Sequence, residues 1–248
     1  MTLASAPADT AFTGLWWNDG DAFRSRLFDG VSLLLPSGEQ FVVDAVSDWL
    51  RQAQKPAVSP ALRDEVNRFV REEAAHQRAH RLYNDRLAEH APAQRLEERI
   101  ASAVGEIASR SLATRLAFAA AFEQLTALLS DEILRARSPW LGHGAAPQLR
   151  LWRWHCAEEI GHRHVALDVL TAAQVSHGRR VLAMLAAVLY LAMDLTACLA
   201  AFCRHDVRSG RIGVWRLVVQ GCGFAIRATP GVLRMGWGGL RYMAAPAR

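Results

Sequence analysis

Two pairs of a glutamate and a histidine, three residues apart, are the side chains of this sequence best suited to chemistry. Glu73 and His76 form one pair, and Glu159 and His162 form the other, each within a stretch of helical periodicity. At positions i and i+3 of a helix both side chains leave the same face, so a carboxylate oxygen and an imidazole nitrogen can converge on one metal ion. The pairs therefore predict metal binding.

An acidic residue precedes each pair at nearly the same distance. Glu39 lies 34 residues before Glu73, and Glu123 lies 36 residues before Glu159. Glu123 stands in the apolar run LAFAAAFEQLTALL, where a carboxylate without a partner is costly to bury. The alternative for Glu39 is an acid in the first turn of a helix, but the repeat favours a ligand. One Glu from each of two helices and Glu-x-x-His from two others match a four-helix dimetal carboxylate site.

Two further histidines share these faces. His80 follows His76 by four residues, and His155 precedes Glu159 by four. Each is either a further ligand or a group behind the ligands, and His80 has the alternative of a solvated or partly buried histidine outside the site. Glu72 and Glu158 point about 100° away from the proposed ligands on a helix, so we expect them on the surface or behind the ligands.

Proline and glycine divide the chain into helices, and strand signals are weak throughout. We predict an all-α protein with an irregular lead over 1–35, a four-helix metal-binding bundle over 36–176 and an apolar helical extension over 177–248. Pro36-Ser37-Gly38 is expected to open the first helix, with Ser37 as its N-cap. The predicted helices cover residues 39–54, 60–87, 94–110, 111–136 and 148–174.

The extension contains an apolar run over 181–203 that is long enough to cross a bilayer. Asp194 lies in its middle, at a cost of about 2.5–3.5 kcal/mol for insertion. It needs a partner such as Arg204 or another arginine, or it faces a polar site. A core helix, a helix on a membrane surface and a homodimer interface are the alternatives. The Gly-rich tail around Pro230 gives no clear pattern.

Composition limits the class of protein. The chain has 248 residues, 51% of them hydrophobic, which is enough for a full core. Its 29 basic and 24 acidic residues are spread along the sequence, which argues against nucleic-acid binding. The four cysteines form no CxxC pair and are expected to be reduced and buried, and the first residues lack a leader pattern. We therefore expect a cytoplasmic protein, with membrane association as an alternative.

The stretches PSGEQFVV, REEAAHQRAHRLYN and WRWHCAEEIGHRHVALDV resemble the bacterial family of predicted metal-dependent hydrolases, whose helices are similar to those of the ferritin-like dimetal carboxylate superfamily. The resemblance covers about residues 31–175, and the tail departs from the Pro-Gly-Phe-His-Pro-like segment expected of the family. It implies a ferritin-like fold. The ligands that it implies are Glu39, Glu73, His76, Glu123, Glu159 and His162, with His80 and His155 matching further histidines.

We favour a function as a di-iron oxidase or oxygenase that uses dioxygen on a small, apolar substrate. Glutamate and histidine suit two iron ions, or manganese, and a four-helix core excludes water from the reaction. The alternative is a metal-dependent hydrolase with a metal-activated water, although no acid or base stands apart from the ligands. The second alternative is iron handling without catalysis.

Overall fold

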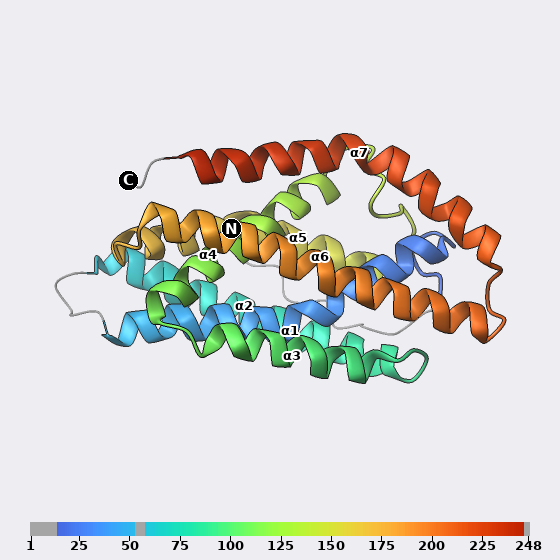
Figure 1. The fold of residues 1–248 in the computed structure, drawn as a ribbon, viewed down its shortest axis with the longest axis horizontal. Helices are drawn as coiled ribbons and strands as arrows, with labels where there is room; N and C mark the ends of the chain where they lie inside the picture. The colour runs from blue at the N-terminus through green and yellow to red at the C-terminus, as the bar shows by residue number, and fades with distance from the viewer. Residues whose placement is uncertain (1–13, 53–57, 246–248) are drawn as a thin grey trace.

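The computed structural model describes residues 14–52 and 58–245, and this part of the chain is all-α, as predicted. It contains helices and connecting turns, with no strand among the described residues (Figure 1). Seven helices are present there: α1 (Ala22–Gln52), α2 (Pro60–Ala88), α3 (Ala93–Ala108), α4 (Leu112–Ile133), α5 (Pro147–Ala172), α6 (His177–Arg208) and α7 (Val214–Ala244).

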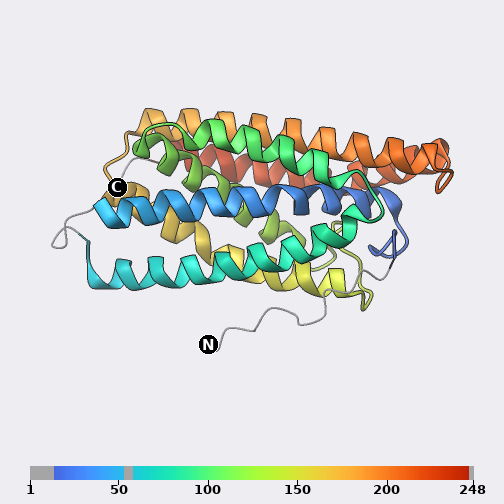
Figure 2. The ribbon, with the colours of Figure 1, turned by 90° about the horizontal axis from the view of Figure 1, so that it is seen from below.

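The four helices expected to carry the ligands are neighbours. α1 contacts α2 and α4, and α5 contacts the same two helices. The helices run along the long axis of the molecule, with α3 outside α1 and α2 (Figures 1 and 2). α6 lies on α1 and α4, and α7 contacts α4, α1 and α6. The C-terminal apolar region is therefore two long helices that complete the core.

The prediction of an irregular lead up to residue 35 was wrong for residues 22–35. α1 begins at Ala22 and continues through Pro36, so Ser37 is not an N-cap and Glu39 lies in mid-helix. Residues 1–13 of the lead lie outside the described residues. A first-turn role for Glu39 at the helix dipole is thereby excluded.

A side chain from α2 explains why a proline is tolerated inside α1. Pro36 has no N–H, so the carbonyl of Ser32, four residues earlier, loses its helical partner. The amide of Asn84 donates to this carbonyl at 3.0 Å, and the Ser32 hydroxyl donates to Asn84 Oδ1 at 2.6 Å. The proline was misread as a helix start because its compensating partner lies far along the sequence.

Individual side chains refine other expectations. Asp194 does find an arginine, but it is Arg99 of α3, whose Nη2 lies 2.8 Å from Asp194 Oδ1. Cys156 and Cys198 are buried as predicted, whereas Cys203 is partly exposed and Cys222 is exposed on α7. Cys203 lies on α6 and Cys222 on α7, and both helices have long outward faces, which accounts for the error.

A fully buried group of charges joins α1 to α6. Arg26 donates to both oxygens of Asp206, at 2.7 and 2.9 Å, and to Asp29 at 2.8 Å. Asp29 also accepts hydrogen bonds from Trp17, at 3.0 Å, and from Tyr83 of α2. Burial raises the pKa of Asp29, although Arg26 acts in the opposite direction. This group fixes the place of α6 over the bundle.

Removing one charge from this group should destabilise the fold. We expect Asp206→Asn to lower the free energy of unfolding by about 3–5 kcal/mol, because it leaves the Arg26 charge buried without a full partner. Asp194→Asn in the same helix is the matched control, with an expected loss of about 1 kcal/mol or less, since its partner Arg99 is half-exposed. Urea unfolding of both variants measures this difference, and equal losses would contradict it.

Candidate metal centre

The predicted donors meet in the interior between α1, α2, α4 and α5. All are buried, with at most 5% of each residue exposed. Each Glu-x-x-His pair places both side chains inward because i and i+3 share a helix face. The residues that converge are Glu39 from α1, Glu73 and His76 from α2, Glu123 from α4, and His155, Glu159 and His162 from α5.

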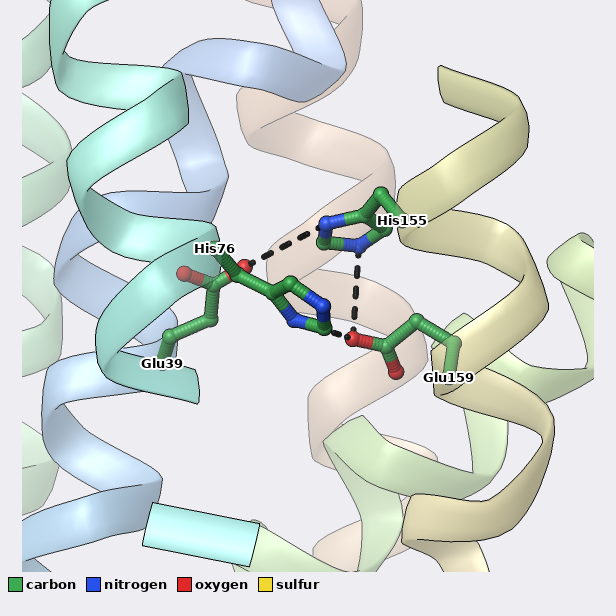
Figure 3. Close-up of side chains that lie close together, drawn as sticks. All are labelled: Glu39, His76, His155 and Glu159. Atoms are coloured by element: carbon green, nitrogen blue, oxygen red, sulfur yellow. Dashed lines mark ion pairs between the residues drawn. The ribbon is translucent and has the colours of Figure 1, made fainter. Parts of the chain in front are cut away.

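One group of potential metal ligands joins α1, α2 and α5. Glu39, His76, His155 and Glu159 each offer one ligand atom, and these atoms lie within 4.8 Å of one another. Figure 3 shows these side chains pointing toward one another. Glu159 Oε1 lies 3.3 Å from His155 Nε2 and 3.5 Å from His76 Nδ1. His155 Nδ1 lies 4.0 Å from Glu39 Oε1.

A second group overlaps the first. Glu73, His76, Glu159 and His162 also offer ligand atoms within 4.8 Å of one another. His162 Nδ1 lies 2.5 Å from Glu73 Oε1, 3.7 Å from Glu159 Oε1 and 4.0 Å from Glu123 Oε2. His76 and Glu159 belong to both groups, so adjacent cations would share ligands. This is the arrangement that a bridged pair of metal ions requires.

Many of the donor atoms make no hydrogen bond within the described part of the chain, which is what a metal-binding site requires. Burying such atoms without a partner is costly, and a bound cation removes the cost. Carboxylate and imidazole donors suit iron and manganese. The buried atoms that make no hydrogen bond include both carboxylate oxygens of Glu39 and Glu73, Oε2 of Glu123, and Nδ1 of His76, His155 and His162.

Two outer acids orient the histidines in a reciprocal manner. His76 of α2 donates through Nε2 to Glu158 of α5, and His162 of α5 donates through Nε2 to Glu72 of α2, both at 3.0 Å. Each histidine therefore turns Nδ1 toward the centre of the site. Of the two expectations for these acids, a place behind the ligands is the one that the structure supports. The cross-pairing could not be read from one helix alone, because it depends on the register of α2 against α5.

The pKa values of the buried acids and histidines are shifted, mostly in directions that reduce the net negative charge of the site. Burial, with neighbouring carboxylates, raises the pKa of Glu39 and Glu123. Burial alone would lower the pKa of His76 and His162, but hydrogen bonds to the surrounding carboxylates raise both. Burial likewise opposes ionisation of Glu159, yet the neighbouring His76 and His162 rings lower its pKa. Protons thus compensate the acids without metal, and a cation would replace them.

The two additional histidines have different surroundings. His155 belongs to the first group of donors, whereas His80 belongs to neither group. His80 is fully buried, so the alternative of a solvated or partly buried histidine was wrong, and burial lowers its pKa to about 3. Its Nδ1 lies 2.9 Å from the Ser32 hydroxyl, and its Nε2 makes no hydrogen bond. The His80 ring lies 4.9 Å from the ring of His155. His80 therefore lies between the metal-binding donors and Ser32, the residue of α1 whose carbonyl is freed by Pro36.

A small apolar cavity of about 70 Å³ borders the carboxylates of Glu39, Glu123 and Glu159. Its wall includes Thr126, whose hydroxyl donates to Glu159 Oε2 at 2.7 Å. Sequence reasoning missed Thr126, although its place three residues after Glu123 was a usable signal. The other lining side chains are mostly apolar and come from α1, α3, α4 and α6, among them Leu35, Val42, Ile107, Phe122 and Leu191.

Removing a central carboxylate tests the site directly. We expect Glu123→Ala and Glu159→Ala each to abolish stoichiometric metal binding while most helicity remains, because each removes an acid from the centre of the buried donors. Elemental analysis of the purified proteins and far-ultraviolet circular dichroism measure the two quantities. Asp168→Ala, an exposed acid of α5, is the control and should keep the wild-type metal content. Wild-type metal content in both site variants would contradict the assignment.

Removing an outer acid should weaken metal binding without abolishing it. We expect Glu158→Gln to lower the metal affinity about 10- to 100-fold, because His76 loses the carboxylate that orients its ring. Glu72→Gln should act in the same way on His162. Competition with a metal-binding indicator measures the affinity, with exposed Glu65→Gln of α2 as the control. An affinity unchanged in both variants would show that the outer acids do not position the ligands.

Comparison with known proteins supports these findings at the level of family. No curated protein and no solved structure matches the chain significantly. The model of a family described as predicted metal-dependent hydrolase matches residues 8–244. The match extends beyond the resemblance at 31–175 and includes both C-terminal helices, so the departure of the tail from the expected pattern does not set α6 and α7 apart. The chain belongs to the predicted metal-dependent hydrolase family.

Proposed function

We propose that this chain is a dinuclear metal enzyme that acts on an apolar substrate in the cavity beside Glu39, Glu123 and Glu159. The observation that carries the proposal is the convergence of unsatisfied, buried carboxylate and histidine donors at the wall of an apolar cavity. A purely structural cluster would pair its polar atoms internally. An apolar wall would select the substrate by burial of hydrocarbon.

The residues of the chain have separable tasks in this proposal. His76, Glu159 and the other donors would hold the metals, and Glu158 and Glu72 would keep the histidine rings aimed inward. Thr126 fixes one oxygen of Glu159, so that the carboxylate keeps its orientation at the cavity wall. The apolar side chains around them would exclude bulk water and place the substrate against the donors.

Hydrolysis is the reaction that the family description supports, and it is the first candidate. Bound divalent metals would lower the pKa of a water molecule and polarise the scissile carbonyl of an ester or amide. Glu39 and Glu123 border the cavity, so metals held by their carboxylates would lie at its wall.

Oxygen activation is the second candidate, and the donor set together with the apolar wall favours it. A reduced pair of iron ions would supply electrons to dioxygen. The cavity is lined mostly by aliphatic and aromatic side chains, which suits a reaction that water would quench. Iron is the proposed metal for this reaction, with manganese as the alternative for either one.

An assay of the metal-loaded protein separates the two candidates. If hydrolysis is the reaction, p-nitrophenyl octanoate should be cleaved faster than the acetate ester, and Glu123→Ala should abolish cleavage. If oxygen activation is the reaction, the protein loaded with ferrous iron should show an absorption change on exposure to air. A metal-loaded protein that does neither would contradict an enzymatic function and leave iron handling.

A cavity variant tests the place of the substrate. Leu191→Trp on α6 should fill the cavity and raise the KM for the octanoate ester about tenfold or more while the metal content stays unchanged. Leu185→Trp, an exposed leucine of the same helix, is the matched control and should leave KM unchanged. An equal effect of both substitutions would place the substrate elsewhere.

A further inference from the structure

The outward faces of α6 and α7 carry large apolar side chains that no described part of the chain covers. Two tryptophans of α7 are prominent among them, Trp215 with 77% and Trp237 with 64% of their surface exposed. On α7 these residues recur at intervals of three, four or seven positions along one side, opposite the buried Phe224. The others include Leu182, Leu189 and Met193 of α6, and Ile226 and Leu233 of α7.

The charges beside these side chains are of one sign. Asp194 and Asp206 are the acidic residues of α6, and each is paired with an arginine of another helix, whereas α7 has no acidic residue. Six exposed arginines make no ion pair with any residue that the structure describes. They are Arg179, Arg204 and Arg208 on α6, and Arg216, Arg227 and Arg241 on α7.

From this combination we infer that the outward face of α6 and α7 is a docking surface for an anionic phospholipid bilayer. Apolar side chains would enter the acyl boundary while the arginines meet phosphate groups, and tryptophan favours this boundary region. A symmetric contact with a second copy fits less well, because it would bring the same unpaired arginines together without an acid to meet them.

The surface would lie on the membrane and not cross it. α6 is long and apolar enough to span a bilayer, but it packs against α1 and α4 along its length. Cys198 and Phe202 on the inner side of α6 are fully buried, and Asp206 of the same helix is held by Arg26. A spanning α6 would leave these groups without partners, so an orientation in the plane of the membrane keeps the fold intact.

An apolar groove connects this face to the interior. A cavity of about 270 Å³ lies between α1, α4, α6 and α7, and its wall includes Val188 of α6 and Met235 of α7. Leu34, Leu35 and Leu191 line both this groove and the cavity beside the carboxylates. A hydrocarbon chain from a bilayer would thus have a continuous apolar wall to follow. This last step, unlike the docking surface, rests on the proposed function.

Flotation with vesicles tests the docking surface. The full chain should bind vesicles of phosphatidylcholine and phosphatidylglycerol much more strongly than phosphatidylcholine alone, and less strongly in high salt. Leu233→Ser/Trp237→Ser should lower the partition coefficient about tenfold or more, because two large apolar side chains are lost from the contact. Arg216→Gln/Arg227→Gln should lower it about fivefold per arginine.

Matched variants on α2 serve as controls. Leu82→Ser, and separately Arg71→Gln/Arg78→Gln, change exposed residues of the same types and should leave binding unchanged. Glu123→Ala should also bind vesicles normally, so failure of the metal assignment does not affect this test. The inference is overturned if the wild-type chain does not float with anionic vesicles, or if the α7 variants bind like it. A dimer that dissociates in Leu233→Ser/Trp237→Ser would also overturn it, by assigning the face to a second copy.

Discussion

Four carboxylates share one buried space between α1, α2, α4 and α5, and their mutual repulsion is the constraint that organises the interior. Coulomb interactions are strong where water is excluded, so the acids must be neutralised by protons, histidines or cations. The structure meets this demand with His76 and His162, each held between an inner and an outer acid. The helices that carry them are held in register by the same contacts. Chemistry and architecture therefore depend on one set of side chains.

Sequence reasoning found the donors because helical geometry ties a three-residue spacing to one face. The two Glu-x-x-His pairs, and an acid repeated 34 or 36 residues earlier, needed no tertiary information. The all-α class followed in the same way. The assignment to ferritin-like folds stays a prediction, as does the identity of the metal.

Features that depend on distant partners escaped the sequence. The start of α1 was misplaced because the carbonyl freed by Pro36 is satisfied by Asn84 of another helix. The pairing of Glu158 with His76 depends on how α5 lies against α2, and the pairing of Asp194 with Arg99 depends on where α3 lies. Thr126 acquires its role only because α4 turns it toward Glu159. In each case the sequence did not indicate which residue is the partner, because the packing of the helices decides that.

The burial of Arg26 has a consequence for the autonomy of the bundle. Its guanidinium is satisfied mainly by Asp206, near the end of α6, and Phe202 beside it completes the core around Leu33 and Tyr83. A chain that stopped before α6 would expose this apolar surface and leave the buried Arg26 of α1 without Asp206. The donor-bearing helices thus share a buried ion pair and a common core with α6. Grafting the metal centre onto another protein would require α6, or a replacement for Asp206 and Phe202, as well as the four helices that carry the donors.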